Sequence, residues 1–159
     1  MNLLDSGPNA SQHGPLRDIE LAREKLAAEV LSLVVVKQGQ TLFTSSKSGV
    51  RGLIEAIREC GSSLNGAALA DRIVGKAAAL LCAYAKISRV YACVMSRPGS
   101  AVLRRFLIPF EHRTLVRNIL DRHKTGICPF ERLVLDVDSP NVAFTRIIKC
   151  LIVKASERT

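Results

Sequence analysis

The sequence predicts an α/β sandwich, in which one mixed sheet of four or five strands is covered by helices on both faces. Two short apolar runs, residues 31–37 and 89–95, are rich in β-branched residues and predict buried strands. Segments with helical spacing separate these runs, and such alternation is typical of a three-layer α/β fold. The apolar fraction of 48% and the charged fraction of 23% fit a globular protein rather than a disordered one.

The first part of the chain predicts a tail, a helix and a hairpin. The 159 residues have the length of one domain, which we place at residues 16–155 after a flexible tail over residues 1–15. Apolar residues at helical spacing predict an amphipathic helix over residues 17–29. Gly39 provides a turn between the first strand and a second strand at residues 40–44, so the two form a hairpin.

The rest of the chain predicts mainly helices. Residues 49–60 form an amphipathic helix that ends at Gly61. The alanine-rich residues 67–85 predict one long helix, which is apolar nearly all round from Ile73 onward and therefore central. After the second buried strand, a short helix precedes an edge strand at residues 107–112. Three further helices complete the prediction, over residues 114–121, 128–135 and 140–154.

The cysteines and the net charge indicate in which compartment the protein functions and which partners are plausible. The five cysteines are odd in number and form no CxxC pair, and the N-terminal residues lack the basic and apolar regions of a secretory signal. We therefore expect reduced thiols in a cytoplasmic protein, and no apolar run is long enough to cross a membrane. The net charge of +9 makes nucleic acid or a phosphate-bearing ligand a plausible partner. Only seven Phe and Tyr residues and no Trp argue against base-stacking platforms.

The seven residues TGICPFE, from Thr125 to Glu131, predict a helix start with a cysteine at the capping position. Cys128 is the expected N-cap, Pro129 takes the first helical position, and Glu131 can reach back to the cap as in a capping box. The thiol would face unpaired amides and the positive end of the helix dipole. That arrangement favours a thiolate or a bound anion.

Three stretches carry a resemblance to a known family: SGVRGLIEAI from Ser48, ADRIVGKAAALL from Ala70, and TGICPFE from Thr125. Over about residues 31–147, the chain resembles uncharacterised domain-of-unknown-function proteins whose structural relatives are the cytidine deaminases. The resemblance implies a cytidine-deaminase-like fold. It also implies that the starts of the two helices at Lys76 and Cys128 lie side by side.

The chain departs from the deaminase pattern at the zinc ligands. Those enzymes bind zinc through a His or Cys in the pattern His-Ala-Glu and through two cysteines in the pattern Pro-Cys-x-x-Cys. Here the matching positions read Gly75, Lys76 and Ala77 in one helix, and Cys128 to Glu131 in the other. A catalytic zinc needs three protein ligands and an open position for water. We therefore expect no metal, no other cofactor and no zinc-dependent deamination.

The residues that remain predict a polar cluster at these helix starts. Lys76 is the only charge on an otherwise apolar segment, so it should meet a carboxylate, and Glu131 is the natural partner. Asp71 would line the same cavity, Gly75 would allow close approach of a ligand, and Gly126 belongs to the loop before Cys128. The cluster is either a site for a nucleotide-like or phosphate-bearing ligand, or a structural ion pair that holds two helices in register.

Three functions stay open from the sequence. The first is binding of a nucleotide-like or phosphate-bearing small ligand, or of a protein partner, without deamination. The second is an enzyme that uses Cys128 as nucleophile, with Lys76 and Glu131 or Asp71 as acid and base. The third is a basic nucleic-acid-binding module. The edge strand near Leu107 and the apolar last helix are the elements that would serve a homodimer.

Overall fold

The computed structural model describes residues 14–158 and contains one mixed five-stranded sheet in the order β2-β1-β3-β4-β5. The strands are β1 (Leu33–Lys37), β2 (Gln40–Ser45), β3 (Ala68–Val74), β4 (Arg89–Ser96) and β5 (Phe110–Val116). The helices are α1 (Pro15–Ala28), α2 (Arg51–Cys60), the 3-10 turn η2 (Gly61–Leu64), α3 (Lys76–Tyr84), α4 (Arg97–Arg105), α5 (Pro129–Leu133) and α6 (Pro140–Glu157). The predicted α/β class with a mixed sheet is therefore confirmed.

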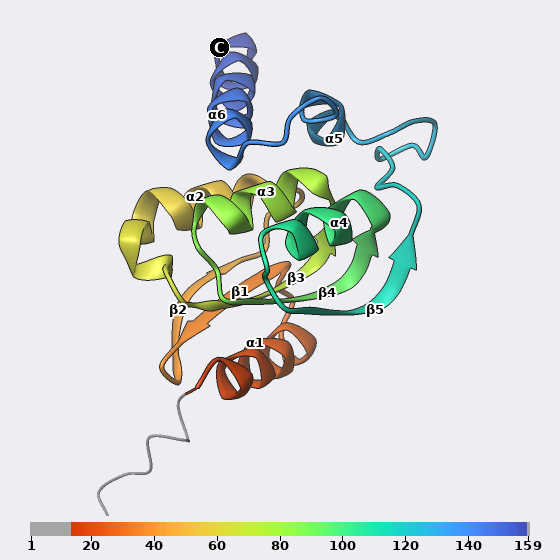
Figure 1. Cartoon of the computed structure of the whole chain (residues 1–159). Coiled ribbons are helices and arrows are strands. Elements are labelled where there is room, and N and C mark those ends of the chain that lie inside the picture. The colour runs from red at the N-terminus through yellow and green to blue at the C-terminus, as the bar shows by residue number, and fades with distance from the viewer. Residues whose placement is uncertain (1–13, 159) are drawn as a thin grey trace, which may run out of the picture.

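The helices cover the two faces of the sheet unequally (Figure 1). Helices α2, α3 and α4 pack on one face, where the larger core cluster lies, and α5 and α6 lie beyond them. Among the described residues, α1 is the helix on the opposite face, and its buried side chains form a smaller cluster with β1 and β3. Because one helix is narrower than five strands, the β4 and β5 half of that face stays more open.

Strand direction sets where the helices begin. β1 runs antiparallel to both β2 and β3, whereas β3, β4 and β5 are parallel to one another. Strands β2, β3 and β4 therefore end at the same edge of the sheet, and α2, α3 and α4 begin there. In open α/β sheets, ligands bind outside the carboxyl ends of strands. A ligand site is therefore expected at this edge.

The predicted long helix over residues 67–85 is wrong in its first half. Residues Ala68–Val74 form the central strand β3, and only Lys76–Tyr84 are helical. Alanines favour a helix, but pairing on both sides, with β1 and β4, overrides this preference. Gly75 marks the change from strand to helix.

The predicted helix over residues 114–121 is also wrong. The edge strand β5 extends to Val116, since the β-branched Thr114 and Val116 pair with β4. Leu107, at φ 57°, lies in the turn after α4, ahead of this strand. The helix expected over 128–135 is shorter and ends at Leu133.

The other predicted elements agree with the structure within a few residues. These are the first helix, the hairpin, the helix before Gly61, the strand from Arg89 and the last helix. Of the expected tail over residues 1–15, residues 1–13 lie outside the described residues, while Gly14 caps α1 and Pro15 begins it. Within residues 14–158, no helix has the length and apolar character that a membrane crossing requires.

Candidate functional site

The start of α3 is capped by a side chain that is distant in the sequence. Both carboxylate oxygens of Glu131 accept backbone hydrogen bonds: Oε2 from the Lys76 amide at 2.9 Å and Oε1 from the Ala77 amide at 3.1 Å. These two amides belong to the first turn of α3, which has no partner for them within the helix. Burial raises the pKa of Glu131, although both hydrogen bonds and the charge of Lys76 oppose the rise. Glu131 thus joins α5 to α3.

Gly75 makes room for this carboxylate. A β-carbon on Gly75 would lie 2.1 Å from Oε1 of Glu131 and 2.9 Å from Cγ1 of Ile119. Behind it, a β-carbon on Gly99 would lie only 2.9 Å from the carbonyl carbon of Gly75. The backbone at Gly75 is therefore enclosed between Glu131 and the first turn of α4. The close approach predicted for Gly75 is present, but the protein's own carboxylate makes it.

The predicted contact between Lys76 and Glu131 is present in a different form. Glu131 binds the backbone amide of Lys76, whereas the ammonium group donates to the Leu135 carbonyl at 3.0 Å. The predicted capping box is wrong, since Glu131 turns away from Cys128 toward α3. Two amides of a helix start offer the carboxylate two hydrogen bonds, and the flexible lysine can reach an exposed carbonyl instead.

Cys128 and Gly126 belong to the loop that leads into α5. Cys128 is the N-cap of α5, is half-buried, and donates its amide to the Ile119 carbonyl at 3.0 Å. The Gly126 carbonyl accepts from the Asp121 amide at 2.8 Å. Hydrogen bonds from Thr125 lower the pKa of Asp121 and close this loop around its carboxylate. The loop is thus held by its own hydrogen bonds, next to the cap on α3.

Asp71 lies in a separate pocket. Because β3 is a strand, the side chain of Asp71 leaves the sheet near the beginning of β1 and the loop after β2, not beside Lys76. The residue is 7% exposed, and Oδ1 accepts from the Ile73 amide at 3.0 Å. Burial raises the pKa of Asp71 to about 7, despite hydrogen bonds from backbone amides. Such a group can give or take a proton at neutral pH.

The pocket around Asp71 has a volume of about 220 Å³ and combines apolar walls with hydroxyl groups. The lining residues are Val30, Leu31, Ser32, Ser46, Ser48, Gly49, Asp71, Arg72 and Ile73.

The loop from Ser45 to Gly49 gives this pocket its shape. The Ser32 hydroxyl fixes the loop by donating to the carbonyls of Ser45 and Lys47, at 3.0 and 2.6 Å. Ser46 and Ser48 are exposed, and within residues 14–158 their hydroxyls have no hydrogen-bond partner. These two hydroxyls are therefore available to a ligand.

Phe130 connects this pocket with the TGICPFE segment. A β-carbon on Gly49, which has φ 67°, would lie 3.7 Å from Cε2 of Phe130. The residue beside Phe130 is Glu131, so the Asp71 pocket and the cap on α3 are neighbours at one sheet edge. Sequence reasoning missed Ser46, Ser48 and Ile73. The only signal for the serines was the small, polar run SSKSG after a predicted strand.

The residues at the two helix starts do not fit a zinc ion. Both oxygens of Glu131 are engaged by amides of α3, and Gly75, Lys76 and Ala77 supply no imidazole or thiolate. Across the described part of the chain, no group of three or more His, Cys, Asp or Glu side chains is arranged to hold a metal ion. A zinc site needs three such ligands.

Comparison with known proteins gives a family. The family model for a domain of unknown function, DUF1893, matches residues 21–151. The chain belongs to the DUF1893 family. The predicted relationship to an uncharacterised family is therefore confirmed. A search of curated proteins gave no match to this DUF1893 chain.

Two solved structures are similar to this DUF1893 protein. A DUF1893 family protein from Thermotoga maritima is 26% identical, with a TM-score of 0.78, over 91% of this chain and 97% of that chain. A dCMP deaminase from the cyanophage S-TIM5, in its apo form, is 14% identical, with a TM-score of 0.45, over 66% of this chain and 99% of that chain.

The contacts around Cys128 bear on the enzyme alternative in this DUF1893 protein. Its proposed acid and base, Lys76 and Glu131, hydrogen-bond to Leu135 and to amides of α3. We therefore expect Cys128 to react with iodoacetamide at pH 7 no faster than Cys150, another half-buried thiol. Mass spectrometry of peptides after timed labelling measures both rates. Clearly faster labelling of Cys128 would instead support a nucleophile.

Proposed function

We propose that this chain binds a small nucleotide-like ligand in the Asp71 pocket and does not deaminate it through zinc. The observation that carries the proposal is a buried carboxyl group lining a pocket at the carboxyl end of the central strand. Sites in open α/β sheets occur at this position. A cytoplasmic location, which we also propose, agrees with five free cysteines.

The size and lining of the pocket favour a planar polar ring. A volume of about 220 Å³ is below the range of roughly 300–1,000 Å³ for drug-sized ligands, so a single heterocycle suits it better than a large molecule. Leu31 and Ile73 offer apolar contact to the ring faces. Ser46 and Ser48 offer hydroxyls that donate and accept hydrogen bonds.

Asp71 suits recognition of a ring nitrogen. Its charged form accepts a hydrogen bond from a ring N–H or an amino group, and its neutral form donates to an unprotonated ring nitrogen. Because its pKa is raised to about 7, both forms are populated at neutral pH. The carboxyl group can therefore match either pattern on a nucleobase.

The proposal is tested by calorimetric titration with a panel of nucleobases, nucleosides and nucleoside monophosphates. We expect at least one to bind, and we expect Asp71→Asn to weaken that binding about 10-fold or more by changing one buried hydrogen bond. The matched control is Asp138→Asn, which alters a carboxylate that is exposed and paired with Arg105. Failure of the whole panel, or equal weakening by both variants, would refute the proposal.

A further inference from the structure

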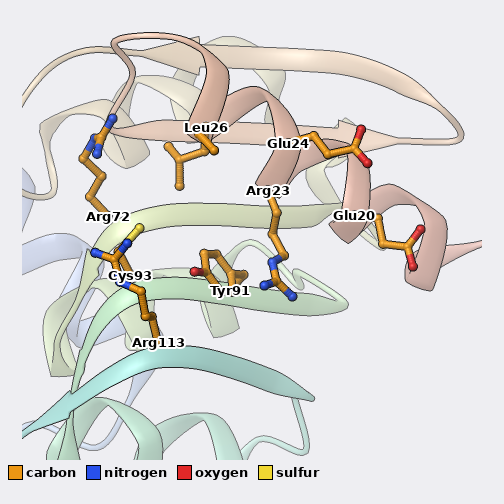
Figure 2. A pocket seen from close by; sticks show the side chains of 9 residues that line it. Glu20, Arg23, Glu24, Leu26, Arg72, Tyr91, Cys93 and Arg113 are labelled. Carbon is orange, nitrogen blue, oxygen red and sulfur yellow. The ribbon is translucent and has the colours of Figure 1, made fainter.

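The sheet face beneath α1 carries a second hollow, on the side opposite α2 and α3. It has a volume of about 550 Å³ and lies between α1 and strands β3, β4 and β5 (Figure 2). Its lining residues are Glu20, Arg23, Glu24, Leu26, Ala27, Arg72, Tyr91, Cys93 and Arg113. Arg72 is the residue that this hollow shares with the Asp71 pocket.

Strand register places two arginines on either side of a cysteine. In the pairing of β3 with β4, Asp71 lies opposite Ala92 and Ile73 lies opposite Val94. Arg72 of β3 is therefore level with Cys93 of β4. In the pairing of β4 with β5, Ala92 lies opposite His112 and Val94 lies opposite Thr114, so Arg113 of β5 is level with Cys93. All three side chains line the same hollow. The row across the sheet therefore reads Arg72, Cys93, Arg113.

The spacing of the two arginines in this row suits the binding of an anion. Neighbouring strands are about 4.8 Å apart, so the two arginine backbones are separated by about 10 Å. Cys93 between them has a short side chain, which leaves a recess with a long cationic side chain on each side. Guanidinium groups bind phosphate through paired N–H donors, and two of them can reach one phosphate across this spacing.

The two arginines of the row have unused donors. Arg113 makes no hydrogen bond or ion pair within residues 14–158. Arg72 uses its Nε on the Leu31 carbonyl, which leaves its two terminal nitrogens free. Both side chains are exposed, so their charges are accessible to a ligand in the hollow.

Two other charged side chains of the hollow, Arg23 and Glu20, form ion pairs with residues of the protein. Arg23 pairs with Glu111 at 2.8 Å and lies 4.2 Å from the centre of the Tyr91 ring. Glu20 pairs with Arg17 at 3.3 Å. Figure 2 shows Glu20 and Glu24 at the end of the hollow away from Cys93, with the Tyr91 hydroxyl directed toward Cys93. The end at Cys93 is thus cationic, whereas the other end carries two carboxylates, of which that of Glu20 is paired with Arg17.

We propose that this hollow binds the phosphate group of a small phosphate monoester that also carries hydroxyl groups. Arg72 and Arg113 hold the phosphate over Cys93, and the Tyr91 hydroxyl donates to it. The hydroxyl-bearing part extends toward Glu20 and Glu24, whose carboxylates accept hydrogen bonds from a sugar or polyol. An extended nucleic-acid backbone suits the hollow less well, because its further phosphates would approach these two carboxylates.

Cys93 provides a reporter inside the proposed site. Its alkylation is followed by mass spectrometry with inorganic phosphate, ribose 5-phosphate or AMP present, and Cys150 serves as the internal reference. We expect at least one phosphate monoester to slow labelling of Cys93 and leave Cys150 unchanged. We expect Arg113→Gln to raise the concentration needed for half protection by about 10-fold, as for loss of a charged hydrogen bond.

Control variants separate this site from the Asp71 pocket and from general basicity. Arg117→Gln removes an exposed charge outside the hollow and should leave protection unchanged, as should Asp71→Asn. The proposal is overturned if no monoester protects Cys93, or if the Arg113 and Arg117 variants behave alike. Stronger protection by a single-stranded oligonucleotide than by every monoester would also overturn it, since that result identifies a nucleic-acid surface.

Discussion

Glu131→Ala is expected to lower the free energy of unfolding by about 3 kcal/mol, because it leaves one buried and one partly buried backbone amide without an acceptor. The two amides are those of Lys76 and Ala77, which Glu131 binds at 2.9 and 3.1 Å. The same substitution also detaches α5 from α3. Urea denaturation followed by circular dichroism measures the change.

Gly75→Ala tests the contact between Glu131 and the start of α3 by changing the residue that faces the carboxylate. Its β-carbon would lie 2.1 Å from a Glu131 oxygen, so the variant should also lose several kcal/mol. In the Glu131→Ala background this clash is absent, and the added cost of Gly75→Ala should fall by about 1–3 kcal/mol. The remaining cost comes from Ile119, at 2.9 Å. Strictly additive effects would contradict the contact.

An exposed glutamate provides the control for the Glu131 variant. Glu59 lies on α2 and faces solvent, so Glu59→Ala should change the free energy of unfolding by less than about 0.5 kcal/mol. If both variants changed the free energy of unfolding by this small amount, Glu131 would be an ordinary surface residue.

Asp71→Asn is expected to stabilise the protein at pH 8. Burial raises the pKa of Asp71 from 3.8 to about 7, so the folded protein is penalised when this carboxyl group is charged. The difference between these pKa values corresponds to roughly 4 kcal/mol. Asparagine keeps an oxygen that can accept from the Ile73 amide, but it carries no charge.

The pH dependence gives the sign of this effect. A carboxyl group with a raised pKa in the folded state contributes its stability below pH 3.8, and loses it as pH rises toward about 7. The wild-type protein and Asp71→Asn should therefore be equally stable near pH 3.5 and diverge up to pH 7. Denaturant unfolding at several pH values measures this difference. A variant less stable than wild type at pH 8 would contradict the prediction.

Together, these variants would distinguish a structural acid from a functional one. Glu131 is expected to stabilise the fold through its two hydrogen bonds to α3, although its raised pKa means that its ionisation offsets part of this gain at neutral pH, whereas the charged form of Asp71 is expected to destabilise the fold. A residue that weakens the fold but lines a pocket is typical of functional sites, where activity and stability conflict. For this reason we propose that the ligand binds at Asp71 and that Glu131 has a structural role.

The sequence indicated that TGICPFE and the start of α3 meet, but not how. The resemblance of VGKAAA and CPFE to paired helix starts was sufficient to predict that Lys76 and Glu131 lie close together. Which atoms touch depends on side-chain direction, and a lysine can reach past a carboxylate to a carbonyl. The close approach at Gly75 was predicted, whereas its cause, the Glu131 carboxylate, depends on the three-dimensional structure.

The Asp71 pocket was missed because one strand was read as helix. Placing Asp71 on a helix set it one turn before Lys76, whereas on β3 it lies among the loop residues Ser46 and Ser48. Short alanine-rich segments carry too little periodicity to separate strand from helix. The row of Arg72, Cys93 and Arg113 was equally hidden, since it depends on the register of three strands.

The most direct test of the account is the titration of the Asp71 carboxyl group by NMR. Carbon-13 labelling of aspartate, with Asp71→Asn to assign the signal, gives its midpoint in the free protein and with a saturating ligand from the nucleotide panel. The account predicts a midpoint of about 7 that moves when the ligand binds, while the Asp138 signal does not move. A midpoint near 3.8 that the ligand leaves unchanged would contradict it.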